Sequence, residues 1–391
     1  MVNVFFRVFY LFYAVVSTLN YNADDELTCL NDKGIGEEWF FLYKLPEAHH
    51  TNEDQVKSGK AYASIYSSNP QEWNFPTSEI DDVNSPLRAT LSQALIVNPD
   101  EYTTLLLYND QKDTGKETHQ NEPENLLEQK HGHMKGILAY DRRGHGFWMV
   151  HSIPRFPMFN ASYWQYPNTA ENYGQSILCI SLVNSETVLD LFAYANPQYI
   201  KKQFGLHSRH SNGNQSSGQI SVVLTTNKNT KIRAFAKSFD ENIDIYSNLV
   251  ASYLNADLYV ETWRHGPDPG MPSICDGDRH MVINVNNVTI LGKNFTFRYT
   301  SDHSKWAVSS KGNYFCVGDL NRQVKQILRG GTCLCLRNAQ LHSLMNQSVA
   351  ELDTCPRNVK KSESNTLMDI SKYMLAFILF ACLVNILNMH D

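Results

Sequence analysis

The sequence predicts an α/β protein made of two related lobes in one chain. Two segments carry the same pair of basic residues, and each pair leads into an apolar run that is typical of a strand. Elsewhere, buried-strand patterns alternate with helix-start signals, which indicates a layered α/β fold. The 391 residues, of which 42% are hydrophobic and 19% charged, suffice for two lobes with full cores.

The N-terminal lobe is expected over residues 24–206. Its first strand ends at a proline, and its first helix begins where a serine cap at residue 85 precedes a proline. In order, the sequence predicts strands at 39–46, 62–66 and 105–110, a helix from 85 and a polar loop at 111–130.

The C-terminal lobe is expected over residues 220–356. The segment 207–219 is polar and rich in Ser, Asn and Gly, so it is predicted to be the loop between the lobes. A strand at 220–224 follows it, and the apolar spacing within 240–253 predicts a helix.

Two histidine–lysine pairs are the main functional signal. On an extended segment His303 and Lys305 point to the same face, because side chains alternate along a strand. A single His-x-Lys is usually a solvated surface strand, but the run 132–136 repeats the pair as His133 and Lys135. An imidazole beside an ammonium suits a phosphodiester, since histidine can attack phosphorus or move a proton and lysine can hold charge on oxygen.

The likeness between the two segments continues downstream. Eighteen residues after His133 comes His151, and eighteen after His303 comes Asn321, each following a second apolar run. Such self-similarity indicates an internal duplication, so we expect both pairs to meet across a pseudo-twofold axis and form one site. Asn321, with His151 in a supporting role, is predicted to orient its own half-site.

With these segments in view, the chain resembles the deoxyribonuclease II family, a branch of the phospholipase D-like superfamily. The resemblance covers nearly all of residues 29–355 and implies a phospholipase D-like pseudo-dimer of two β-sheet and helix lobes. The matching stretches include Trp39-Phe40-Phe41-Leu42-Tyr43-Lys44-Leu45-Pro46, Leu107-Tyr108-Asn109-Asp110, 132–136, 147–157, 173–176, Phe235-Ala236-Lys237, 261–263, 302–306 and Gly318-Asp319-Leu320-Asn321-Arg322.

The predicted activity is that of a metal-independent acid endodeoxyribonuclease acting on DNA. One of His133 and His303 would attack phosphorus and form a phosphohistidine, while the other donates a proton to the leaving oxygen. The resemblance implies that the 5′-oxygen leaves, so that 3′-phosphate ends result. Lys135 and Lys305 would replace the charge of a metal, so no cofactor is expected. The predicted catalytic residues are His133, Lys135, His303, Lys305 and Asn321.

The alternatives to this function are a zinc-dependent enzyme, a phospholipase-type phosphodiesterase and a non-catalytic nucleic-acid-binding protein. A zinc site at His131 and His133 is disfavoured, because the second motif supplies lysine and asparagine but no carboxylate ligand. A phospholipase-type phosphodiesterase would use the same pairs in an apolar cleft. A non-catalytic nucleic-acid-binding surface protein would need a broken motif, and all four motif residues are present.

Charge adds a prediction about pH. The formal net charge of −6 at pH 7 is a poor match for DNA, whose phosphates dominate binding. Protonation of all 14 histidines would change it to −6 + 14 = +8. Because free histidine titrates near about 6.5, acidification improves the attraction to DNA.

Several features predict the secretory pathway, and hence the lysosome, the cell surface or the extracellular space. Residues 1–17 resemble a cleaved signal peptide, with a membrane anchor as the alternative. Seven cysteines lie in the body of the chain, where an oxidising lumen would pair most of them. Sequons for glycosylation occur at Asn160, Asn214, Asn287, Asn294 and Asn346.

The family resemblance also implies a disulfide pattern. The implied bridges are Cys29–Cys179, Cys275–Cys355 and Cys316–Cys335. Cys333 departs from the pattern and could compete with its neighbour Cys335 for Cys316.

Residues 357–391 differ in character from the rest of the chain. A polar linker precedes the apolar run 373–387, which ends close to the last residue. This arrangement is typical of a lipid-anchor signal, and the run is shorter than the ~20 residues that span a bilayer. A transmembrane tail and a packed soluble helix are the alternatives, so a membrane partner is expected through this segment.

If the tail signals a lipid anchor, a phosphatidylinositol-specific lipase should release the protein from intact cells, which can be measured by immunoblotting the medium. The matched control is a chain truncated after residue 356, which should reach the medium without lipase. Retention on membranes, with a C-terminal peptide that ends at Asp391, would favour a transmembrane tail instead.

Overall fold

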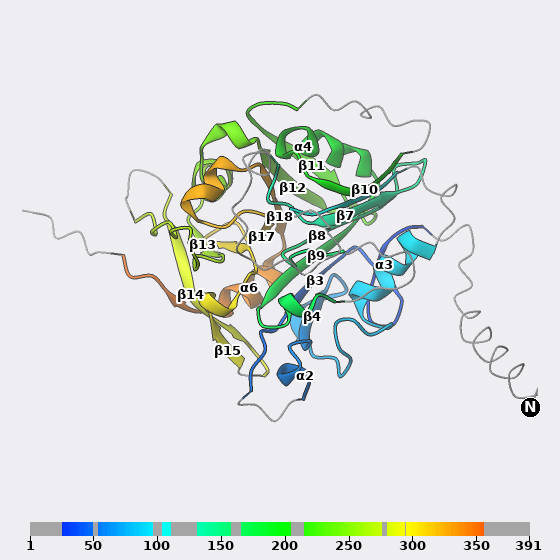
Figure 1. Ribbon diagram of the computed structural model, residues 1–391, viewed down its shortest axis with the longest axis horizontal. Coiled ribbons are helices and arrows are strands. Elements are labelled where there is room, and N and C mark those ends of the chain that lie inside the picture. The colour runs from blue at the N-terminus through cyan, green and yellow to red at the C-terminus, as the bar shows by residue number, and fades with distance from the viewer. Residues whose placement is uncertain are drawn as a thin grey trace, which may run out of the picture. The chain divides into compact units, whose positions relative to one another are not determined.

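Two large β-sheets make up most of the structure (Figure 1). The structure, a computed structural model, describes residues 26–49, 54–96, 104–110, 131–157, 166–204, 215–275, 280–293 and 295–355. Both sheets lie within one unit that extends to Asp353, and Thr354–Asp391 form a second unit.

The first sheet is antiparallel throughout its described strands. Its spatial order is β10-β6-β7-β8-β9-β3-β4-β5. The bounds are β3 Trp39–Lys44, β4 Tyr62–Tyr66, β5 Asn69–Asn74, β6 Thr104–Tyr108, β7 Gly136–Tyr140, β8 Gly146–His151, β9 Gln175–Leu182 and β10 Tyr199–Phe204. A separate two-stranded sheet pairs β1 Cys29–Leu30 with β2 Gly36–Glu37.

The second sheet follows the order β11-β12-β18-β17-β16-β13-β14-β15, with β19 also paired to β14. Its one parallel pair among the described strands is β13 with β14. The bounds are β11 Gln219–Thr225, β12 Lys231–Lys237, β13 Leu258–Glu261, β14 Val282–Ile290, β15 Phe295–Arg298, β16 Trp306–Ser309, β17 Tyr314–Gly318, β18 Gly331–Arg337 and β19 Val349–Leu352.

The strand orders of the two sheets correspond. The series β6-β7-β8-β9-β3 in one sheet matches β13-β16-β17-β18-β12 in the other, both in space and in order along the chain. Beyond them β4 follows β3, whereas its counterpart in space, β11, precedes β12. The first His-Lys segment runs into β7 and the second into β16, which hold the same place in the two series. The two motifs therefore precede strands at corresponding positions in the two sheets.

The largest hydrophobic core contains residues of both sheets and joins them. Side chains alternate along each strand, so Phe41 and Tyr43 of β3 enter this core while Phe40 and Leu42 enter a second core on the other face. In the second sheet, Phe315 of β17 packs edge-on against Phe41 with ring centroids 5.0 Å apart. Because both faces of β3 are covered, its run of apolar residues is continuous.

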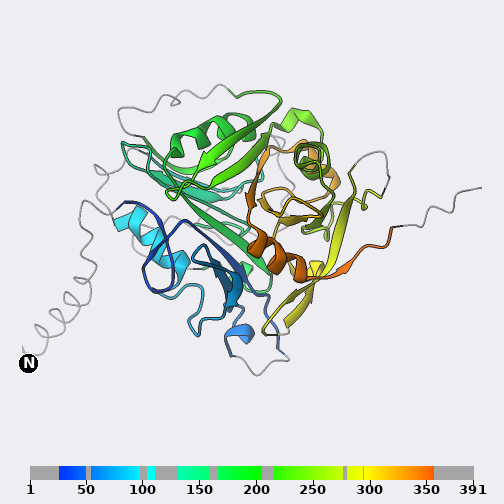
Figure 2. The same cartoon turned by 180° about the vertical axis from the view of Figure 1, so that it is seen from behind.

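The helices are few and short. The bounds are α2 Asp54–Lys57, α3 Pro86–Ile96, α4 Val188–Ala195, α5 Ser252–Leu254 and α6 Ala339–Gln347, with 3₁₀ turns at Asn168–Ala170, Ser185–Thr187, Phe239–Glu241, Tyr299–Ser301 and Val324–Leu328. Although α4 follows β9, it packs on β11 and β12 of the second sheet (Figure 1). The helix α6 lies at the junction of the two sheets, as the view from behind shows in orange (Figure 2).

Most predicted elements are present, and the structure is richer in strands than the alternation of patterns suggested. The strand predicted at 62–66 is β4, and the serine cap is confirmed because Arg88 N–H donates to Ser85 Oγ over 3.1 Å. The helix predicted at 240–253 is different in kind. After Asp244, whose carboxylate caps it, a π-helix spans Ile245–Ala251 and continues as α5.

Two disulfides join neighbouring strands or sheets. Cys29 is bonded to Cys179, and Cys316 is bonded to Cys335, its direct partner across β17 and β18. Cys275 and Cys355 are also disulfide-bonded. Cys333 is a buried free thiol, and it lies opposite Gly318 and not Cys316 in the strand register.

Several predictions lie outside the described residues. These are the signal peptide at 1–17, the loop at 111–130, most of the loop at 207–219, the tail at 357–391 and the sequons at Asn160, Asn214 and Asn294. Within the described ranges, no helix has the length and apolar character needed to cross a membrane.

Candidate active site

A backbone hydrogen bond to the opposite sheet holds each His-Lys motif in place. The backbone N–H of His133 donates to the carbonyl of Gly330, which precedes β18, over 3.0 Å. In the same way His303 N–H donates to the carbonyl of Gly174, which precedes β9, over 2.8 Å. The two motifs therefore face the junction of the sheets from opposite sides.

Electrostatic interactions join the two half-sites. Burial lowers the pKa of His303 well below 6.5, and the ammonium groups of Lys305 and then Lys135 act in the same direction. Burial also lowers the pKa of Lys305 to about 7, again with a contribution from Lys135. The charges of the two predicted pairs therefore act on each other across the junction of the sheets.

A carboxylate that the sequence analysis did not select joins the first pair. Asp110 Oδ2 lies 3.1 Å from His133 Nε2 and 2.8 Å from Lys135 Nζ. Although burial alone would raise it, the pKa of Asp110 is lowered by the charges of Lys135 and His133. Its position in the sequence could have indicated Asp110, because it stands two residues after the end of β6, a buried strand that neighbours β7 in the sheet.

The second nitrogen of His133 fixes its ring. Nδ1 lies 3.0 Å from the backbone carbonyl of Asp319, which can only accept a hydrogen bond, so Nδ1 carries a hydrogen. Nε2 lies 3.1 Å from Asp110 Oδ2 and forms an ion pair with it when the ring is protonated. Burial, followed by Lys135, lowers the pKa of His133 well below 6.5, and Asp110 opposes this shift.

The second half-site has aromatic rings where the first has a carboxylate. His303 stacks on Tyr173 with centroids 4.1 Å apart and meets the edge of Trp263 at 4.3 Å. Within the described residues, no hydrogen bond occupies its ring nitrogens. Lys305 Nζ donates to the carbonyl of His303 over 2.7 Å, so the pair is tied together locally.

Behind His303 lies a buried polar cluster. Tyr43 OH donates to Asp302 Oδ2 over 2.5 Å, and Trp306 Nε1 donates to Tyr43 OH over 3.1 Å. Burial raises the pKa of Asp302. Burial, followed by the charge of Asp302, also raises the pKa of Glu261 well above 4.5. These groups fix the start of β16.

Neither Asn321 nor the His151 ring bonds to a catalytic group among the described residues. Both ring nitrogens of His151 and Oδ1 of Asn321 are buried without a hydrogen-bond partner there. The equal spacing of eighteen residues does not place His151 and Asn321 at equivalent positions in the two sheets. His151 N–H donates to Lys135 O, whereas Gly318 N–H, and not Asn321, donates to Lys305 O. The roles of both side chains stay predictions.

A cluster of possible metal ligands lies elsewhere. Cys316, Cys333 and Cys335 have their sulfur atoms within 4.8 Å of one another, and among the described residues no other such group of His, Cys, Asp or Glu occurs. Two of the three form a disulfide, which removes them as thiolate ligands.

Comparison with known proteins gives the family. The sequence profile of deoxyribonuclease II matches residues 28–355. The chain belongs to the deoxyribonuclease II family. It is therefore a hydrolase of the deoxyribonuclease type.

Relatives match over most of their length. Deoxyribonuclease-2-alpha of Rattus norvegicus is 32% identical over 351 residues, which cover 85% of this chain and 95% of the relative. Plancitoxin-1 of Acanthaster planci is 28% identical over 373 residues, with 88% and 97% covered. Cell death-related nuclease 6 of Caenorhabditis elegans is 30% identical over 370 residues, with 88% and 93% covered.

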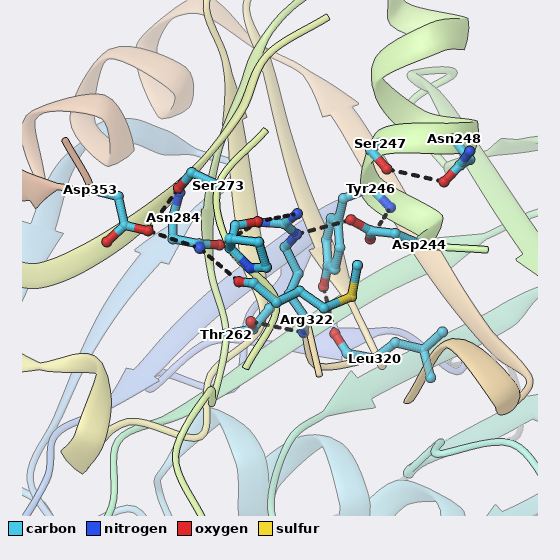
Figure 3. A network of polar contacts seen from close by, with 12 residues as sticks. Asp244, Tyr246, Ser247, Asn248, Thr262, Ser273, Asn284, Leu320, Arg322 and Asp353 are labelled. Atoms are coloured by element: carbon cyan, nitrogen blue, oxygen red, sulfur yellow. Dashed lines mark hydrogen bonds and ion pairs between the residues drawn. The ribbon is translucent and has the colours of Figure 1, made fainter. Parts of the chain in front are cut away.

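In this member of the deoxyribonuclease II family, a buried arginine anchors the loop that carries Asp319 (Figure 3). Arg322 Nε donates to Asp244 Oδ2 over 2.9 Å, and Nη1 donates to Asn284 Oδ1 over 2.5 Å. From the other side Tyr246 OH donates to Leu320 O over 2.9 Å. The segment that directly follows Asp319, whose carbonyl holds the His133 ring, is thus fixed at Leu320 and at Arg322.

Replacement of Arg322 by methionine should lower the free energy of unfolding by about 3–5 kcal/mol, because the buried Asp244 carboxylate loses its cationic partner. Urea denaturation monitored by tryptophan fluorescence measures the change. The matched control is Arg298→Met, at an exposed arginine of β15, which should cost less than about 0.5 kcal/mol. Equal stability of the two variants would contradict the anchoring role.

Proposed function

We propose that the protein is a metal-independent acid endodeoxyribonuclease that hydrolyses DNA to 3′-phosphate ends through a phosphohistidine intermediate. The observation that carries the proposal is the pairing of two His-Lys motifs, each bonded through its histidine N–H to the opposite sheet. Corresponding strand orders in the two sheets support a phospholipase D-like pseudo-dimer. DNA is the proposed partner, and the disulfides support action in the lysosome or outside the cell.

The environments of the two histidines favour different roles. His303 has free ring nitrogens among the described residues, and three ammonium groups, those of Lys305, Lys135 and Lys44, favour its neutral form. We assign it as the nucleophile. His133 faces the Asp110 carboxylate, which opposes the lowering of its pKa, and is assigned as the general acid. Lys135 and Lys305 would hold the non-bridging phosphate oxygens.

The reaction then has two displacement steps. A neutral nitrogen of His303 attacks phosphorus, the bond from phosphorus to the 5′-oxygen breaks, and that oxygen takes the proton of His133. His133, now deprotonated at Nε2, accepts a proton from water. The resulting hydroxide breaks the phosphorus–nitrogen bond, which releases the 3′-phosphate and regenerates His303.

Replacement of His303 by alanine should reduce cleavage of plasmid DNA at pH 5 by more than about a thousandfold, and His133→Ala should behave alike, because both act within one unit. The matched control is His49→Ala, whose side chain is 78% exposed. All assays contain EDTA, in which wild-type activity should persist. Retention of a tenth of the activity, or a loss on chelation that Mg²⁺ or Zn²⁺ restores, would overturn the mechanism.

The pH profile of kcat/KM should be bell-shaped, with its maximum between about pH 4 and 6. The general acid must be protonated, and burial places the pKa of His133 below 6.5, so activity falls as pH rises through that pKa. Lys305, with a pKa of about 7, also loses its charge above neutrality. At lower pH the nucleophile becomes protonated, which gives the acid limb.

Asp110→Asn provides the sharper test of this assignment. Asp110 opposes the lowering of the His133 pKa, so its removal should move the alkaline limb to lower pH by about one unit. The control His49→Gln should leave the limb unchanged. An optimum at or above pH 7.5, or a limb that moves to higher pH in Asp110→Asn, would contradict the assignment.

A further inference from the structure

Two buried lysines outside the two His-Lys motifs occupy equivalent places in the two sheets. Lys44 is the last residue of β3 and pairs with Gln175, the first residue of β9. Lys237 is the last residue of β12 and pairs with Gly331, the first residue of β18. Both lysines are 0% exposed.

The ammonium of Lys44 is fully used by one turn of the chain. Nζ donates to the carbonyls of Ala170 over 2.7 Å, Glu171 over 2.5 Å and Tyr173 over 2.7 Å. An ammonium has three hydrogens to donate, so none remains for a phosphate. Direct binding of substrate by Lys44 is therefore not its role in this arrangement.

Lys237 repeats the pattern in the second sheet. Its Nζ donates to the carbonyls of Ile327 and Arg329, each over 2.7 Å, and of Ser238 over 3.3 Å. Neither lysine forms a salt bridge within the described residues. Burial lowers the pKa of Lys44 to about 7 and that of Lys237 to about 8, so each ammonium is kept at a cost in solvation.

The turns held by these lysines lead directly to the acceptors of the catalytic histidines. Gly174 follows Tyr173 and accepts from His303 N–H, while Gly330 follows Arg329 and accepts from His133 N–H. The approach at Gly174 is close, since a Cβ there would lie 2.4 Å from Asp302 Oδ1. A small shift of either turn would therefore move a histidine backbone.

We propose that Lys44 and Lys237 are positioning residues that act across the sheet junction, Lys44 on His303 and Lys237 on His133, by fixing the turns whose glycine carbonyls hold the histidine backbones. Each sheet thus aligns the reacting group of the other. The inference rests on the proposed function, because it concerns the two histidines assigned to that reaction.

The test uses Lys44→Met and Lys237→Met in the full chain, with Lys311→Met, at an exposed lysine, as the matched control. Histidine is labelled with ¹³C at Cε1, and the His303 and His133 resonances are assigned from His→Gln variants. Lys44→Met should shift the His303 resonance and leave that of His133 in place, and Lys237→Met should do the reverse. Because misplacement by ~1 Å can cost 10²-fold, kcat should fall about a hundredfold with KM changed less than about threefold.

A second variant keeps Lys44 intact. Gly174→Ala pushes against Asp302 and should reproduce the selective shift of the His303 resonance. Equal shifts of both histidines, a rise in KM at constant kcat, or variants that do not fold would assign the lysines to general stability or to binding and overturn the proposal. The resonances are read without substrate, so loss of the proposed function would appear separately, as a wild-type protein inactive on DNA.

Discussion

The hydrogen bonds that cross between the sheets are the constraint on which the site depends. His133 and His303 each take their backbone acceptor from the opposite sheet, and the His133 ring also bonds to the carbonyl of Asp319 in the second sheet. Neither sheet could align its own histidine alone. The shared hydrophobic core, with Phe41 against Phe315, therefore serves the chemistry as well as the stability, because it fixes the distance over which these bonds form.

Concentrated positive charge is the consequence of this arrangement. Two His-Lys pairs and Lys44 act on one another in a largely buried volume, and burial lowers the pKa of both histidines, of Lys305 and of Lys44. For the proposed reaction, the same physical cause would favour both an anionic substrate and operation at acid pH.

The sequence predicted those features that depend on local spacing. His133, Lys135, His303 and Lys305 were predicted from the repeated His-x-Lys spacing, although both pairs stand just before a strand, β7 or β16, and not within it. Asp110 was not, because its partners come from a neighbouring strand, and only strand order places it beside them. The equivalence of His151 and Asn321 was wrong in space.

That last difference has a simple cause in the hairpins. Gly136 pairs with Val150, a separation of 150 − 136 = 14 residues, whereas Trp306 pairs with Val317, a separation of 317 − 306 = 11. The second hairpin is three residues shorter. The eighteenth residue after His133 is therefore the last residue of β8, whereas the eighteenth after His303 lies in the loop beyond β17. Counting along a chain predicts equivalence only where the turns between have equal length.

The two half-sites have corresponding backbone arrangements but different side chains beside their histidines. Tyr108 pairs with Gly136 and Glu261 with Trp306, the residues that directly follow the two lysines. Two positions beyond these strand ends the first sheet carries Asp110 and the second carries Trp263. In the proposed reaction this difference would separate the two roles, because the Asp110 carboxylate opposes the lowering of the His133 pKa, whereas the Trp263 ring beside His303 carries no charge.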